Sequence, residues 1–193
     1  MSNIWKGEKV FLRRADENDA FLYVDSCGNH NTHTEKLFEK IEMPYSLDDC
    51  RRIIAKINSE NEHSDNYLFT VENEEGTPIG QIITFDCDRR MGCFKFGLFF
   101  AESSRGKGYA KEAVTIMLDY YFNQLRYHKA NVYIYDFNEA SKKFHQKMGF
   151  VKEGVLREVA YIDGRYINAE YYGITSTEFV AGDVKKGQTA RKT

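Results

Sequence analysis

Apolar and polar residues alternate along the run 8–14 (EKVFLRR), as they do in a half-buried β-strand. Further runs rich in aromatic and β-branched residues predict more strands. These runs are 67–73, 79–88, 93–100 and 129–137, followed by 161–179. The last run contains Asp163-Gly164, a turn signal, and therefore predicts a hairpin of two strands. The three runs between residues 67 and 100 are separated only by short turns and predict an antiparallel meander.

Two helices are predicted before the meander, because apolar residues there recur every three or four positions. The first follows Asp16, a residue type suited to the N-cap, and places Ala20, Phe21 and Val24 on one face. The second begins at Ser46 and carries a stripe of isoleucines. A polar and irregular stretch separates the two helices.

Two more helices are predicted after the meander. One runs from Gly108 to about Leu125. Its expected buried face holds Ala113, Met117, Leu118, Tyr121 and Phe122. The other helix lies within 138–150 and ends at Gly149, which suits a left-handed C-cap. This order of elements predicts one α+β domain with a mostly antiparallel twisted sheet of about seven strands and about four helices.

Composition excludes several classes of protein. The chain has 193 residues, 42% hydrophobic and 29% charged, as is ordinary for a globular domain. Its 27 Lys and Arg against 29 Asp and Glu give a net charge of −2, which argues against a broad nucleic-acid-binding surface. No run has the length and apolarity of a signal peptide or a membrane span, so we expect a cytoplasmic protein with no membrane partner. Residues 1–181 are expected to form the domain, and 182–193 a polar, disordered tail.

A metal site is not expected either. The four cysteines at 27, 50, 87 and 93 form no CxxC pair and have no zinc-ligand spacing. His30 and His33 lack a helical context and a third ligand. Free thiols in a reducing compartment fit this cysteine usage.

The stretch AESSRGKGYAKEA, which begins at Ala101, puts two glycines and two cations between a predicted strand and a predicted helix. On these residues alone, two interpretations stay open. One is a flexible, basic connection. The other is a phosphate-binding loop, in which backbone N–H groups and the positive end of the helix face an anion.

Two motifs, taken with the order of elements, resemble the GNAT superfamily of acyl-CoA-dependent N-acetyltransferases. RGKGYA fits the family pattern Arg/Gln-x-x-Gly-x-Gly/Ala through Arg105, Gly108 and Ala110. NEASKKFHQKMGF begins at Asn138 and resembles the second signature, an Asn followed by a short helix that ends in Gly-Phe. The resemblance extends over about residues 7–179 and is greatest for the branch of ribosomal-protein N-terminal acetyltransferases and spermidine N-acetyltransferases.

The resemblance implies acetyl-CoA as co-substrate. Backbone amides of 105–110 would hold its diphosphate, together with the helix start. The pantetheine arm would pair with the fourth strand, which splays away from the fifth, and the N–H of Leu98 or Phe99 would stabilise the oxyanion. Asn138 would reach the pantetheine amides, unless it serves only as a helix cap. The implied cofactor-binding residues are Leu98, Phe99, Phe100, Arg105, Gly106, Lys107, Gly108, Tyr109, Ala110, Asn138 and Ser141.

Acyl transfer needs a neutral amine, so a carboxylate, or water held by one, must accept a proton. The candidates are Asp86, Glu102 and Asp136, and the sequence does not choose among them. Many family members place a Tyr four residues before the Gly that ends the short helix, to protonate the CoA sulfur; here that residue is His145. His145 could act as the acid, either by donating its neutral N–H to the sulfur or through a carboxylate such as Asp136 that raises its pKa. Alternatively it only lies in the groove, and the thiolate leaves unassisted or takes a proton from water.

The acceptor is expected to be a small-molecule amine or a protein N-terminus. The polar stretch 29–44 carries Glu35, Glu39 and Glu42, and Asp48 and Asp49 follow it. These acidic residues would suit a cationic acceptor. The reaction would be direct attack of the amine in a ternary complex. The alternative is a non-catalytic acyl-CoA-binding or sensor module, which the absent Tyr keeps open. Dimers are frequent in this fold, so a homodimer stays open as well.

Overall fold

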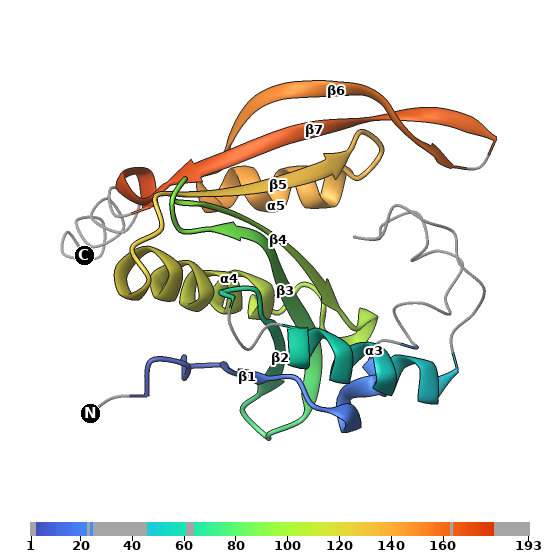
Figure 1. Cartoon of the computed structure of the whole chain (residues 1–193), viewed down its shortest axis with the longest axis vertical. Coiled ribbons are helices and arrows are strands. Elements are labelled where there is room, and N and C mark those ends of the chain that lie inside the picture. Colours follow the sequence, from blue (N-terminus) through green and yellow to red (C-terminus); the bar gives the residue numbers. More distant parts are fainter. Residues whose placement is uncertain (1–2, 23, 25–45, 61–63, 163, 180–193) are drawn as a thin grey trace. The chain divides into compact units, whose positions relative to one another are not determined.

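The structure is a computed structural model that describes residues 3–22, 24, 46–60, 64–162 and 164–179 (Figure 1). Its strands form a sheet in the order β1-β2-β3-β4-β5-β7-β6. They are β1 (Val10–Arg14), β2 (Leu68–Asn73), β3 (Pro78–Asp88), β4 (Cys93–Phe100), β5 (Lys129–Tyr135), β6 (Val151–Ile162) and β7 (Arg165–Thr175). The helices with described bounds are η1 (Glu17–Asp19), α3 (Leu47–Glu60), η2 (Glu102–Ser104), α4 (Tyr109–Asp119), η3 (Tyr120–Gln124) and α5 (Glu139–Met148). The predicted α+β class with a mostly antiparallel sheet is confirmed.

The chain divides into two compact units. The first contains the chain up to Cys87 together with Phe96–Tyr120. The second contains Asp88–Lys95 together with the chain from Tyr121 onward. Strand β4 therefore contributes residues to both units.

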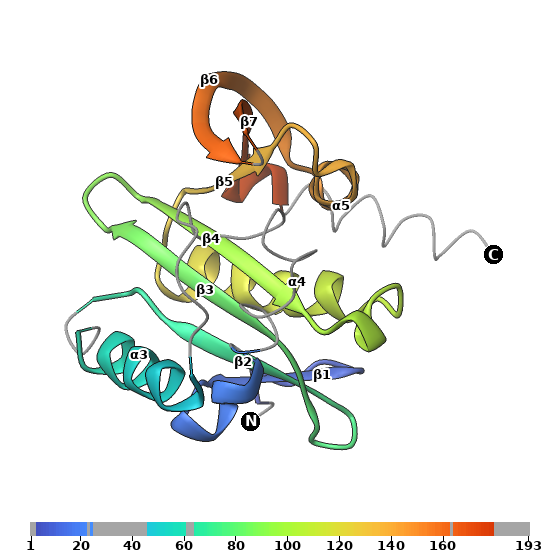
Figure 2. The same ribbon diagram turned by 90° about the vertical axis from the view of Figure 1, so that its right-hand side faces the viewer.

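In the first unit, β1, β2 and β3 pair in antiparallel fashion, with Leu12 opposite Val71 as an example (Figure 2). Helix α3 buries its isoleucine stripe against this part of the sheet, and Ile54 is fully buried there. Ser46 caps the helix as the sequence predicts, since its Oγ accepts a hydrogen bond of 3.1 Å from the Asp49 amide and its own amide donates to the Asp49 carboxylate.

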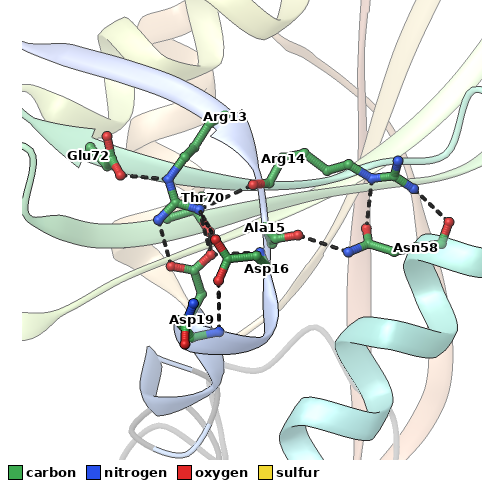
Figure 3. Close-up of polar contacts among 9 residues, drawn as sticks. Arg13, Arg14, Ala15, Asp16, Asp19, Asn58, Thr70 and Glu72 are labelled. Atoms are coloured by element: carbon green, nitrogen blue, oxygen red, sulfur yellow. Dashed lines mark hydrogen bonds and ion pairs between the residues drawn. The ribbon is translucent and has the colours of Figure 1, made fainter.

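A buried ion pair holds β1, β2 and η1 together. Arg13 donates to both carboxylate oxygens of Asp19, at 2.7 and 2.8 Å, and to Glu72 at 2.6 Å (Figure 3). Thr70 Oγ1 donates to Asp19 at 2.8 Å. Burial raises the pKa of Asp19, but hydrogen bonds from Arg13, the Asp16 amide and Thr70 outweigh burial and lower the net pKa below its ordinary value. Asp19 is thus a structural carboxylate.

In the second unit, β4 starts as a parallel partner of β5, with residues 93–95 opposite 129–131. The parallel pairing ends there, so residues 96–100 of β4 take no part in it, as the predicted splay between the fourth and fifth strands requires. Strand β5 also pairs antiparallel with β7, and β7 with β6. The core of this unit includes Phe94, whose ring stacks on Tyr121 with centroids 4.2 Å apart.

Some local predictions need correction. The helix after Gly108 is α-helical only to Asp119 and continues as the π-helical turn η3. Phe21, expected on the buried face of the first helix, is 43% exposed, whereas Leu22 is buried. A 3-10 turn precedes these residues and advances more per residue than an α-helix, which shifts the buried face.

Strand β6 begins at Val151, well before the expected hairpin at 161–179. The single domain 1–181 and the tail 182–193 stay predictions, since the stretch 180–193 lies outside the described residues.

Candidate functional site

The loop between β4 and α4 has an open, left-handed backbone at both of its glycines. Gly106 has φ +77° and Gly108 has φ +87°, a region that residues with a Cβ rarely adopt. A methyl group on Gly106 would have no described heavy atom within 4 Å. A methyl group on Gly108 would have only Lys9 Nζ, at 4.0 Å. The loop thus leaves its backbone accessible on the side where Cβ atoms would stand.

The backbone N–H groups of this loop are hydrogen-bonded at Ser104 and Arg105, and from Gly106 to Ala110 they are available to a ligand. Ser104 N–H donates to the Ala101 carbonyl at 2.8 Å, and Arg105 N–H donates to the Glu102 carbonyl at 3.1 Å. Within the described part of the chain, the N–H groups of residues 106–110 donate to no backbone or side-chain acceptor. Helix α4 has Gly108 as N-cap, with no side-chain cap. The available run of amides therefore begins at Gly106 rather than at Arg105 and continues into the positive end of a helix.

The cations of the motif are placed differently from one another. Arg105 Nε donates to the Phe100 carbonyl at 3.3 Å, so its guanidinium is directed back toward the end of β4. Lys107 is exposed and makes no ion pair among the described residues. Tyr109 and Ala110 are the first two residues of α4 and are half-buried.

A further cation, Lys9, lies beside the loop and was missed by the sequence analysis. It belongs to the segment 5–9, here called the N-terminal turn, which precedes β1. The amides of Glu8 and Lys9 donate to the two carboxylate oxygens of Glu112, in the first turn of α4, at 2.5 and 3.0 Å. No local sequence signal links Lys9 to a loop that lies about a hundred residues away along the chain.

Residues 98–100 of β4, the expected partners of the pantetheine arm, lie in the first unit. Phe100 is buried, whereas Leu98 and Phe99 are half-buried. None of them is in the parallel register with β5.

The second motif forms α5 and its caps, in the second unit. Asn138 is the N-cap, and its Oδ1 accepts a hydrogen bond from the Ser141 amide at 2.9 Å. Gly149 is the C-cap with φ +98°, as predicted. The oxygen of Asn138 serves the cap, and its amide NH2 is the donor that this side chain can offer a ligand.

His145 of α5 is buried and uncharged. Its ring lies in edge-to-face contact with Phe144 and Phe150, and only 3% of the residue is exposed. Burial lowers its pKa from 6.5 to about 4. Nδ1 lies 2.9 Å from the Ser141 carbonyl, which can only accept, so Nδ1 carries the hydrogen and the lone pair is on Nε2. The expectation that Asp136 raises the pKa of His145 is therefore wrong.

The three candidate bases differ in exposure. Asp86 and Glu102 are exposed in the first unit. Asp136, in the second, is half-buried, and its Oδ2 accepts hydrogen bonds from the amide and the side chain of Asn168 at 3.3 and 3.2 Å. Asn168 thus orients the carboxylate of Asp136.

The structure describes only two of the acidic residues expected to attract a cationic acceptor. Asp48 and Asp49 form ion pairs with Arg51 and Arg52 one turn further along α3. The polar stretch 29–44, which contains Glu35, Glu39 and Glu42 as well as His30 and His33, lies outside the described residues. The described residues include no group of three or more His, Cys, Asp or Glu side chains that could hold a metal ion, and no helix among them is long and apolar enough to cross a membrane.

Comparison with known proteins places these features in a family. The family model described as acetyltransferase (GNAT) domain matches residues 9–151, which include both motifs. The SPbeta prophage-derived uncharacterized N-acetyltransferase YokL of Bacillus subtilis is 33% identical over 175 residues, covering 91% of this chain and 94% of that protein. The spermidine N(1)-acetyltransferase of Vibrio cholerae is 26% identical over 168 residues, covering 86% and 94%.

Among solved structures, the spermidine N-acetyltransferase from Vibrio cholerae in complex with CoA and spermine is similar with a TM-score of 0.80. The sequence identity is 24%, and the match covers 90% of this chain and 99% of that chain. This likeness concerns the fold.

Proposed function

The chain belongs to the GNAT acetyltransferase family, and we propose that it transfers the acetyl group of acetyl-CoA directly to a primary amine of a small cationic molecule, with polyamines as the first candidates. By family, it is an acetyl-CoA-dependent N-acetyltransferase. The amine, the direct attack in a ternary complex and the residues that assist it are the proposed part. A cytoplasmic location and a homodimer remain predictions from the sequence.

The observation that carries the proposal is the loop before α4. Its amides at 106–110 are available, its two glycines leave space for close approach, and the positive end of α4 continues the same run. These are the features that bind a diphosphate, and coenzyme A contains one. The loop would hold the nucleotide end of acetyl-CoA, and residues 98–100 of β4 would pair with its pantetheine arm.

In the proposed reaction, the neutral amine nitrogen attacks the thioester carbonyl carbon. The carbon–sulfur bond then breaks, coenzyme A leaves as a thiolate, and the nitrogen gives its second proton to solvent, so that a neutral amide forms. A free alkyl amine has a pKa of about 10, so it must first lose a proton. We assign that proton to one of the three candidate carboxylates, Asp86, Glu102 or Asp136, directly or through water. Of these, Asp136 accepts hydrogen bonds from Asn168 at Oδ2.

His145 has no acid role in this scheme. A ring with a pKa of about 4 is neutral at pH 7, and its hydrogen is on the nitrogen that faces the Ser141 carbonyl. A thiol has a pKa of about 8.5, so its thiolate is a tolerable leaving group near neutral pH and takes its proton from water.

The preference for a cationic small molecule rests on the relatives. The spermidine N(1)-acetyltransferase of Vibrio cholerae is similar over most of both chains. The ion-paired Asp48 and Asp49 add no support from α3. A protein N-terminus therefore stays the competing acceptor within the same chemistry.

A second candidate function is a non-catalytic acyl-CoA-binding module. The observation that favours it is His145, which stands where many family members have a Tyr and is buried and neutral. Such a module would keep the phosphate-binding loop and lack turnover.

The test is release of free thiol from acetyl-CoA in the presence of spermidine, an aminoglycoside, or peptides with an N-terminal Ala or Ser. Turnover with spermidine supports the proposal, and turnover with a peptide alone would move the acceptor class to protein N-termini. A rise in melting temperature with acetyl-CoA, but no thiol release with any amine, would favour the binding module.

A further inference from the structure

We propose that Lys9 is a further coenzyme A-binding residue, whose ammonium binds the diphosphate held by the amides of 106–110, and that Glu112 positions it. The proposal rests on the proposed function, since it assigns a new residue to the same cofactor. It names a group from outside both sequence motifs, contributed by the N-terminal turn.

The backbone of Lys9 is fixed beside the loop. Glu112 accepts hydrogen bonds from the amides of Glu8 and Lys9, one on each carboxylate oxygen. Gly7 lies against the same carboxylate, so closely that a methyl group on Gly7 would overlap it. The N-terminal turn is therefore held on the first turn of α4 at the residue that carries the cation.

The turn is also anchored at its other end. The ring of Trp5 packs against Tyr120 and Phe69, with centroids 4.5 and 5.4 Å apart. The Trp5 carbonyl accepts a hydrogen bond of 2.9 Å from the Leu12 amide. Two anchors on either side give residues 6–9 a defined course past the start of α4.

The ammonium of Lys9 lies in an unfavourable electrostatic position when no anion is bound. Lys9 Nζ lies 4.0 Å from where a methyl group on Gly108 would stand, so the ammonium is next to the positive end of α4. A cation at that end of a helix is unfavourable for the fold by itself. Lys9 makes no ion pair among the described residues, and Lys107 adds a second positive charge to the loop. An anion bound between the ammonium and the amides would replace this repulsion between Lys9 and the helix end by attraction of both to the anion.

Arg105, the cation that the family motif supplies, is directed back toward the end of β4. Its Nε donates to the Phe100 carbonyl, which directs the guanidinium toward β4. Lys9 thus offers a charge on the side of the loop where Gly108 is bare.

The experiment measures the dissociation constants of CoA and of dephospho-CoA by calorimetry on the full chain. We expect Lys9→Ala to weaken both about five- to tenfold, as loss of a charge-assisted contact at an exposed site would. Lys9→Arg should stay within about twofold of wild type, because it keeps the charge. Lys6→Ala is the matched control, since it removes an exposed positive charge from the same turn, and should also stay within about twofold.

Glu112→Gln separates positioning from bulk electrostatics. Loss of a negative charge near a phosphate site would by itself strengthen CoA binding. If Glu112 positions Lys9, the variant weakens CoA binding instead. A glutamine amide has one accepting oxygen and one donating NH2 group, so one of the two backbone N–H groups loses its acceptor. In the Lys9→Ala background, Glu112→Gln should then cause no further weakening.

Equal dissociation constants for the Lys9→Ala and Lys6→Ala variants would overturn the role of Lys9. So would a loss seen with CoA but not with dephospho-CoA, since it would place the contact on the 3′-phosphate. Stronger binding by the Glu112→Gln variant would overturn the positioning role. If the wild-type chain binds neither ligand, the proposed function itself fails, and this outcome is distinct from the others.

Discussion

The two motifs that resemble coenzyme A-binding segments differ in what they leave available to a ligand. In the loop before α4, the amides of 106–110 donate to nothing described, and both glycines face open space. In α5, the oxygen of Asn138 is used in the cap, and the ring of His145 is buried between two Phe rings and bonded to the Ser141 carbonyl. A motif match therefore does not by itself distinguish a ligand site from a structural element. The run of loop amides that donate to no described acceptor makes that distinction.

The largest expected effect concerns His145, as a test of whether α5 is structural. Replacing His145 with Ala should lower the free energy of unfolding by about 2–4 kcal/mol, because it opens a cavity among aromatic rings. Turnover of folded protein should change by less than about threefold, because His145 donates no proton in the proposed scheme. Urea unfolding and thiol-release assays below the melting temperature check both. A large loss of kcat with unchanged stability would return the acid role to His145.

The same residue predicts a pH dependence of stability. The folded pKa of about 4 lies below the unfolded value of about 6.5, so between these values the unfolded chain binds a proton that the folded chain does not. The free energy of unfolding should fall as pH falls from 6.5 to 4, by about 3 kcal/mol in total, and should not depend on His145 above that window. His145→Gln should flatten this segment of the curve.

The next effect tests the open loop. Gly108→Ala should weaken CoA binding about tenfold, because the methyl group would stand where the diphosphate approaches the amides. Gly76, in the turn between β2 and β3, has φ +75° and equally open surroundings, so Gly76→Ala carries a similar backbone cost of about 1 kcal/mol. Calorimetric titration with CoA should separate the two variants, although both lose stability. Equal CoA affinities would mean that the loop does not bind the diphosphate.

Much of the fold could be predicted from the sequence, because burial repeats with the period of each element. The inward face of α4 and η3 is an example, since Ala113, Met117 and Tyr121 are all fully buried. Strand β6 shows where this fails. Val151 and Val155 are about half exposed, so the residues of this edge strand carry no contrast between a buried and an exposed face.

The site could be predicted only where its residues are neighbours in the chain. The glycines of RGKGYA mark the loop because their left-handed backbone is a local requirement. Lys9 and Glu112 meet through tertiary structure, and no spacing rule connects them. The neutral state of His145 depends on Phe144 and Phe150 closing around the ring, which the motif alone does not specify.

The smallest expected effect tests whether Asn138 is more than a cap. Asn138→Ser keeps an oxygen that can accept from the Ser141 amide, so stability should stay within about 0.5 kcal/mol of wild type, whereas Asn138→Ala should lose about 1 kcal/mol. Both variants lose the amide NH2. If that group contacts the pantetheine arm, both should bind CoA about threefold more weakly than wild type, as loss of one neutral hydrogen bond would predict. If the Ser variant binds CoA as wild type does, Asn138 acts through the cap alone, and the contrast between an open loop and a closed α5 becomes complete.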